Sequence, residues 1–261
     1  MSRIKNAFYN AKGEPKKAFI GFITGGDPSI EKTEEFVMEM IRGGADLVEI
    51  GIPFSDPIAE GKVIQQANIR ALRAGTTLAK IFTLVENIRR KTQTPLVFLT
   101  YLNPVFHYGY AKFFEKCRTV GVDGIIIPDL PFEEQGELRG IAAACEVDVI
   151  SLIAPTSRQR IGEIAAAATG FLYIVSSLGV TGIRSKIETD LAAIIALARS
   201  RSALPMAVGF GINTPSQAAE IAKTADGVIV GSALVKIVEE YGEQAGPHIY
   251  TYVKAMKEAI E

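Results

Sequence analysis

The stretch RGGADLVEI, residues 42–50, ends a helical pattern at two glycines, turns at Asp46 and enters a short apolar run. The same order recurs in TVGVDGIII (119–127) and KTADGVIV (223–230), which also turn at an aspartate. A repeated helix-turn-strand unit suits parallel strands, because each crossover between them needs a connection long enough for a helix. The sequence therefore predicts strands that alternate with helices.

Eight such apolar runs divide the chain almost evenly. They are AFIGFIT (18–24), DLVEIGI (46–52), PLVFLTY (95–101), VDGIIIP (122–128), DVISLIA (148–154), FLYIVSS (171–177), PMAVGFG (205–211) and GVIVG (227–231). Eight strands with covering helices predict a closed (β/α)8 TIM barrel, and 261 residues are typical of one. We expect a single barrel domain over 1–261, with a short N-terminal helix at about residues 2–11. An open doubly wound sheet is the alternative, which the count of eight runs disfavours.

The spacing of the runs also predicts where the long loops lie. The longest steps between run starts, from 46 to 95 and from 171 to 205, follow the second and sixth strands. Surplus loop length in a compact fold is often functional. Both loops would project from the carboxyl ends of the strands, where the active sites of barrels lie.

The composition is that of a soluble globular domain, with 48% hydrophobic and 22% charged residues. A net charge of −1 argues against general attraction to nucleic acid or to membranes. Cys117 and Cys145 form no CxxC or Cys/His cluster, so we expect inert thiols and no metal site. Because neither a signal peptide nor an apolar run of about 18 residues is present, we expect a cytoplasmic protein.

Glu49 is a carboxylate among apolar residues in the second run. Strand alternation puts Leu47, Glu49 and Gly51 on one face, and Val48 and Ile50 on the other. If the face of Glu49 is the barrel interior, desolvation raises its pKa and suits it to proton transfer near neutral pH. The alternative is a carboxylate that is paired with a neighbouring cation.

The next segment, PFSDPIAEGKVIQQA (53–67), carries Asp56 and Glu60. Glu60 is a candidate second carboxylate, facing Glu49 across a pocket. The alternative for either loop acid is a solvated position on the surface.

Glycine loops follow the last three strands. They contain Gly179, Thr181 and Gly182 after the sixth run, Gly209 and Gly211 at the seventh, and Gly231 with Ser232 after the eighth. Glycines let backbone N–H groups approach an anion closely, and a helix N-terminus that Ser232 caps would add partial positive charge. Barrels often bind phosphate in the loops after strands 7 and 8. Three such loops at adjacent strand ends predict a phosphate site, with ordinary turn glycines as the alternative.

Other catalytic chemistry has little support in the sequence. His107 and His248 are the only histidines, and they belong to no Ser/His/Asp or metal-ligand pattern. Nucleophilic hydrolysis and metal catalysis are therefore disfavoured. Lys62 and Lys236 lie near the proposed site, where a solvated or phosphate-facing role is favoured over a Schiff base.

Taken together, these segments resemble the α subunit of tryptophan synthase from about residue 18 to 256. The motifs that carry the resemblance are FITGGDP (22–28), VEIGIPFSDP (48–57), EGKVIQQAN (60–68), YLNP (101–104), IIPDLP (126–131), GVTG (179–182), GFGI (209–212) and GSALVK (231–236). PFSDP and GVTG, in this order on a barrel of this length, are highly specific together.

The resemblance implies retro-aldol cleavage of indole-3-glycerol phosphate to indole and glyceraldehyde 3-phosphate. By the same resemblance Glu49 matches the main acid/base, Glu60 the carboxylate that holds the indole N–H, and Tyr173 a tyrosine beside the reacting centre. The positions that match the indole pocket are Phe22, Leu99, Ile126, Leu152, Thr181 and Phe210. Those that match the phosphate cradle are Gly182, Gly211, Gly231 and Ser232.

Two positions depart from the family pattern. The family most often has aspartate where this chain has Glu60, and proline where it has Lys62. The longer arm of Glu60 puts its hydrogen-bond geometry in question, although the chemistry needs a carboxylate rather than one particular stem.

The resemblance also implies a partner, the β subunit, in an α2β2 heterotetramer. That subunit activates the α subunit, receives indole through a tunnel and carries the PLP, so we expect no cofactor in this chain. We expect the interface on the carboxyl-end face, at Pro53, Asp56, Pro57, Asn103 and Pro104.

Two other functions stay open at this point. One is another phosphosugar barrel, such as an isomerase or the synthase of indole-3-glycerol phosphate, although the strands lack the catalytic lysines of that synthase. The other is a regulatory subunit that binds the phosphate ligand without catalysis.

Overall fold

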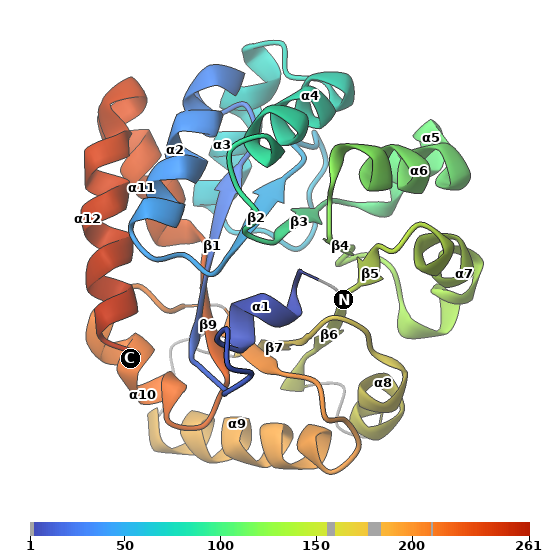
Figure 1. Ribbon diagram of the computed structural model, residues 1–261, viewed down its shortest axis with the longest axis vertical. Coiled ribbons are helices and arrows are strands. Elements are labelled where there is room, and N and C mark those ends of the chain that lie inside the picture. The colour runs from blue at the N-terminus through green and yellow to red at the C-terminus, as the bar shows by residue number, and fades with distance from the viewer. Residues whose placement is uncertain (1–2, 156–159, 177–183, 210) are drawn as a thin grey trace.

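The computed structural model describes residues 3–155, 160–176, 184–209 and 211–261. The strands in these residues are β1 (Ala18–Thr24), β2 (Leu47–Gly51), β3 (Leu96–Leu99), β4 (Gly124–Ile126), β5 (Asp148–Val149), β6 (Ser151–Ile153), β7 (Leu172–Val175), β8 (Met206–Gly209) and β9 (Gly227–Val230). They form one sheet in the order β5-β4-β3-β2-β1-β9-β8-β7-β6, with helices around it (Figure 1).

The sheet curls into a barrel. β1 pairs in parallel with both β2 and the last strand, β9, which an open doubly wound order would not give. The two ends of the sheet meet in one segment, because β5 pairs with β4, β6 pairs with β7, and only Ile150 separates β5 from β6. The predicted barrel is confirmed. Its fifth strand, predicted as 148–154, consists of two short pieces because the chain changes its pairing partner at Ile150.

The helices lie outside the sheet, except for the first. They are α1 (Lys5–Phe8), α2 (Ile30–Arg42), α3 (Lys62–Arg73), α4 (Leu78–Arg89), α5 (Leu102–Tyr108), α6 (Tyr110–Val120), η1 (Phe132–Glu134), α7 (Gly136–Ala144), α8 (Ile161–Ala167), α9 (Arg184–Arg199), α10 (Pro215–Ala222), α11 (Ser232–Tyr241), η3 (Gly242–Gln244) and α12 (Ala245–Glu258). Among the described residues, no helix combines the length and the apolar character needed to cross a membrane.

The predicted long loops have different outcomes. The long step after β2 holds the loop 52–61 and then two helices, α3 and α4, so part of the surplus length is an additional helix. The loop after the sixth predicted strand includes residues 177–183, which lie outside the described residues.

The repeated aspartates join neighbouring strands at their amino ends. Each side chain accepts a hydrogen bond from a backbone N–H of the preceding strand: Asp46 from Phe19 at 2.8 Å, Asp123 from Leu96 at 2.8 Å, and Asp226 from Met206 at 2.9 Å. Each also forms ion pairs: Asp46 with Lys16 and Lys257, Asp123 with Arg3 and Arg89, and Asp226 with Arg199. The internal repeat is thus a structural device, and it leaves the carboxyl ends of the strands free for a site.

Helix α1 fills the barrel interior at the amino ends of the strands. Ile4, Ala7 and Phe8 belong to the same buried cluster as inward-facing strand residues, and the Phe8 and Phe171 rings lie 5.7 Å apart between centroids. Figure 1 shows α1 lying across the centre of the ring of strands. The helix is shorter than predicted because the chain becomes extended at Tyr9, where φ is −133°.

Candidate active site

Glu49 lies in the middle of β2, beside Phe22 of β1 and Val97 of β3 in the strand register. Leu47, two residues earlier, belongs to the interior cluster, whereas Val48 and Ile50 belong to the core between sheet and helices. Side chains alternate along a strand, so Glu49 shares the interior face with Leu47.

The carboxyl group of Glu49 is almost fully desolvated. The residue is 1% exposed, and its Oε1 atom has no hydrogen-bond partner in the part of the chain that the structure describes. Burial raises the pKa of Glu49 from 4.5 to about 8, and no opposing contribution from a cation is present among the described residues. The alternative of a charge-paired structural carboxylate therefore has no support there.

Tyr173 on β7 shares this interior with Glu49. Burial raises the pKa of the Tyr173 phenol well above 10, and the charge of Glu49 raises it further. The Tyr173 hydroxyl lies directly over Gly209 of β8: a Cβ atom there would stand 2.3 Å from it. The phenol fits only because position 209 has no side chain.

Glu60 stands at the end of the loop after β2 and is half-buried. Its Oε2 accepts a hydrogen bond of 2.6 Å from Asn68 Nδ2. Burial raises the pKa of Glu60 to about 7, while hydrogen bonds from Asn68 and Tyr101 act to lower it. The partners and the partial burial disfavour a simple solvated loop acid.

Apolar side chains from several strand ends surround these groups. Leu99 packs against both the interior cluster, which contains Ile126 and partly buried Leu152, and a smaller cluster around Phe22. The Phe22 ring touches two backbone glycine positions: a Cβ at Gly51 would be 2.7 Å from it, and one at Gly231 would be 3.3 Å away. Phe22 therefore links the end of β2 to the start of α11.

The predicted phosphate cradle is described only in part. Gly231 is the N-cap of α11 and Ser232 its first helical residue, without a side-chain cap hydrogen bond. The expectation that Ser232 caps the helix is therefore wrong, because the chain enters the helix one residue earlier. Gly211 has φ of +77°, a conformation that suits glycine. The other predicted contacts, Thr181, Gly182 and Phe210, lie outside the described residues.

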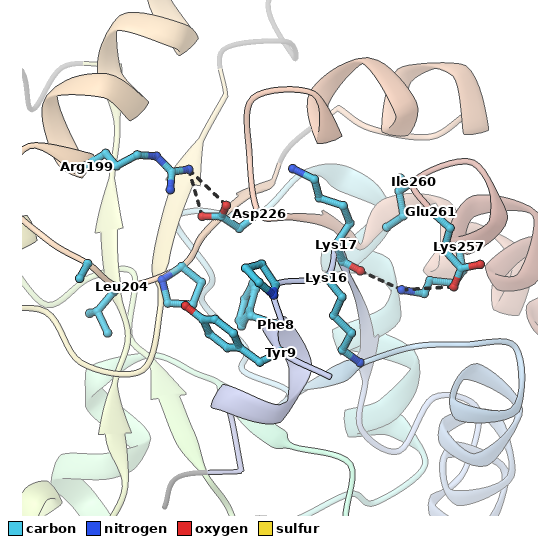
Figure 2. A pocket seen from close by; sticks show the side chains of 13 residues that line it. Phe8, Tyr9, Lys16, Lys17, Arg199, Leu204, Asp226, Lys257, Ile260 and Glu261 are labelled. Atoms are coloured by element: carbon cyan, nitrogen blue, oxygen red, sulfur yellow. Dashed lines mark hydrogen bonds and ion pairs between the residues drawn. The ribbon is translucent and has the colours of Figure 1, made fainter. Parts of the chain in front are cut away.

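A cavity of about 450 Å³ lies at the opposite, amino ends of the strands. Figure 2 shows the partners of two of its cations: the Arg199 guanidinium group pairs with Asp226, and the Lys257 ammonium group donates to the backbone carbonyl group of Lys17. Since none of the predicted site residues lines it, this cavity is not the candidate active site.

Comparison with known proteins identifies the family. The family model described as tryptophan synthase alpha chain matches residues 8–261. The chain belongs to the tryptophan synthase alpha chain family. The alpha chain of Citrifermentans bemidjiense is 47% identical over 262 residues, covering 100% of this chain and 98% of that protein. The alpha chain of Lactiplantibacillus plantarum is 49% identical over 246 residues, 94% and 93% of the two chains.

Solved structures of tryptophan synthase alpha chains have the same fold. The Legionella pneumophila alpha chain superimposes with a TM-score of 0.89 at 36% identity, covering 100% of this chain and 97% of that one. A chain of the tryptophan synthase complex from Pyrococcus furiosus gives 0.83 at 34% identity, with 92% and 97% covered.

Two residues of this tryptophan synthase alpha chain site were missed in the sequence, Asn68 and Tyr101. Both are buried, and both hydrogen-bond to Glu60. The signal for Asn68 was present, because it lies between Ala67 and Ala71 on the buried face of α3. Tyr101 carried no such signal, because an aromatic residue at the end of an apolar strand reads as core.

Proposed function

We propose that this chain cleaves indole-3-glycerol phosphate to indole and glyceraldehyde 3-phosphate. The observation that carries the proposal is the buried Glu49 carboxyl group, whose pKa is raised to about 8 inside an apolar barrel. A general acid/base works best when its pKa lies near the working pH. Family membership supplies the substrate, and Glu49 supplies the group that can move its protons.

The proposed chemistry is a retro-aldol step. C3 of the indole ring gains a proton, the hydroxyl group on the adjacent glycerol carbon loses one, and the bond between these carbons breaks. The electron pair of that bond passes into the ring to give indole, and the glycerol carbon becomes the aldehyde. Glu49 shuttles both protons, so the enzyme ends the cycle as it began.

Glu60 and Tyr173 support this step from two sides. The Glu60 carboxylate accepts the hydrogen bond of the indole N–H and stabilises the positive charge that develops on the ring. Tyr173 lies beside Glu49 in the interior and borders the reacting carbons. The apolar side chains of Phe22, Leu99 and Ile126 suit a flat aromatic ring.

The phosphate group is assigned to the N-terminus of α11. Gly231 and Ser232 stand at the start of this ten-residue helix, where free N–H groups and the helix dipole favour an anion. Phe22 touches the Gly231 position, so the phosphate end and the aromatic pocket are contiguous. Gly182 and Gly211 complete the proposed cradle.

Indole release tests the proposal. Purified chain is incubated with indole-3-glycerol phosphate, with and without a tryptophan synthase β subunit, and indole is measured. Activity that disappears in Glu49→Gln, while ligand binding is retained, supports the lyase. Binding without turnover in either condition would instead support the regulatory alternative.

We also propose that the chain forms an α2β2 complex with a β subunit, which holds the PLP; no cofactor is assigned to this chain. The solved relatives include a structure described as the mutually activated a2b2 complex of Pyrococcus furiosus. Two apolar side chains next to the predicted interface segments support this surface, Ile58 at 79% and Phe106 at 65% exposure. Co-elution of this chain with the β subunit tests the complex, and we expect it to be lost in Phe106→Asp.

We also propose that the protein is located in the cytoplasm.

A further inference from the structure

Asn68 is a buried amide in the middle of α3, where the other buried residues are Ala67 and Ala71. Asparagine is a weak helix former because its side chain competes for backbone hydrogen bonds. A buried amide also loses free energy unless it finds partners. Only 4% of Asn68 is exposed. Because asparagine does not stabilise the helix, we expect the role of this side chain to lie in a contact outside α3.

The partner of Asn68 is the carboxylate of Glu60. Asn68 Nδ2 donates to Oε2 at 2.6 Å, and Gln65, one turn earlier on α3, donates to the carbonyl group of Glu60 at 2.8 Å. The N–H of the preceding residue, Ala59, donates to the Tyr101 hydroxyl at 3.0 Å. The side chain, the carbonyl group and the approach of the chain to Glu60 are thus each fixed separately.

The helix that carries these donors is itself anchored. Arg70 donates two hydrogen bonds to Asp27, of 2.9 and 2.8 Å, and Asp27 is 1% exposed. Such a two-point contact fixes orientation as well as distance. The amide of Asn68, two residues from Arg70, therefore approaches Glu60 from a rigid support.

We propose that Asn68 is a positioning residue for the lyase reaction, which holds the carboxylate of Glu60 where it meets the indole N–H. This inference rests on the proposed function, which gives Glu60 that partner. Glutamate has one more rotatable bond than aspartate, so its carboxylate needs an external donor to stay in one place. A carboxylate accepts about four hydrogen bonds, and the contact with Asn68 leaves capacity for the substrate.

The same contact favours the charged form of Glu60. Burial raises the pKa of Glu60 and the hydrogen bond from Asn68 lowers it, so loss of that bond moves the titration of Glu60 upward. The one other side chain among the causes of this shift is Tyr101, a titratable phenol whose hydrogen bond also lowers the pKa of Glu60. Asn68 therefore supports both the location and the ionisation of the carboxylate.

The first experiment measures the titration of Glu60 directly. The infrared band of the protonated carboxyl group is followed between pH 5 and 9, and Glu60→Gln identifies it. In Asn68→Leu, which keeps the volume but removes the donor, we expect the midpoint to rise by about one pH unit, the size of a charge-assisted hydrogen bond. Asn68→Ser, too short to reach Oε2, should give the same shift if Asn68→Leu fails to fold.

The second experiment is a double-mutant cycle on indole release at pH 7. Asn68→Leu should lower kcat about tenfold with KM changed less than about twofold, because the charge on the ring develops only in the transition state. In the Glu60→Gln background the same change should have almost no further effect. Asn87→Leu, on α4, is the matched control and should leave indole release unchanged in both backgrounds.

Two results would overturn the inference: an unchanged Glu60 titration in the folded variants, or an equal loss of kcat in both backgrounds. Either would mean that Asn68 only stabilises α3. If the unaltered chain releases no indole with or without a β subunit, the proposed function fails, whereas the infrared titration still decides the role of Asn68.

Discussion

Replacing Glu49 by glutamine should make the protein more stable above neutral pH while it abolishes indole release. The pKa of Glu49 rises from 4.5 to about 8 because the folded chain buries the carboxyl group without a compensating partner among the described residues. Glutamine keeps the shape of the side chain and removes its titration. The variant therefore separates the cost of this ionisable group from its chemistry.

The sign and size follow from proton linkage. Below pH 4.5 the group carries its proton in both the folded and the unfolded chain, so pH has no effect through it. From pH 4.5 to about 8 the unfolded chain releases the proton and the folded chain retains it. The free energy of unfolding then falls by about 1.4 kcal/mol per pH unit, to a total loss of about 5 kcal/mol.

Thermal unfolding measures this loss. The Tm of Glu49→Gln minus that of the unaltered chain should widen by roughly 10 °C between pH 5 and pH 8, given about 2–4 °C per kcal/mol for a chain of this size. Glu86→Gln, an exposed position paired with Arg90, is the control and should show a flat difference. A difference for Glu49→Gln that stays constant over this range would refute the reasoning, because it would mean that Glu49 ionises as freely folded as unfolded.

Three further changes test other parts of the structure. Gly209→Ala would place a methyl group 2.3 Å from the phenol oxygen above it, so kcat for indole release should fall at least about tenfold; Gly140→Ala in α7, where nothing lies within 4 Å, should instead raise stability by about 1 kcal/mol. Asp123→Ala removes the partner of two arginines and of one strand N–H, and should lower stability by about 3 kcal/mol in thermal melts, whereas Glu86→Ala should change it by less than about 0.5 kcal/mol. Burial raises the pKa of the Cys117 thiol, so alkylation should modify it only after unfolding; rapid labelling of the native chain would contradict this.

The repetitive parts of the fold could be predicted from the sequence because the strands are mostly apolar on both faces and three of the helix-to-strand junctions share the same aspartate turn. The break of the fifth strand at Ile150 could not, because it depends on which neighbour each residue pairs with. The additional helix after β2 could not be predicted either, because the spacing between two strands gives the length of the connection and not its secondary structure.

The candidate site, too, could be predicted from the sequence only in part. Glu49 stands out in the sequence because a charge within an apolar strand is unusual, and its desolvation follows from the strand it occupies. The contacts of Glu60 do not follow, because Asn68 and Tyr101 reach it only when α3 and the end of β3 are packed together. Pairwise geometry between distant segments is what the sequence left open.

Helix α1 closes the barrel at the amino ends of the strands. Ile4 and Phe8 fill the amino-end part of the interior, so a ligand of Glu49 is expected to enter from the carboxyl ends of the strands. A second subunit bound at the carboxyl ends of the strands would therefore control both substrate entry and product release. Substrate entry and product release then share one route. Their order is set by the complex rather than by either chain alone.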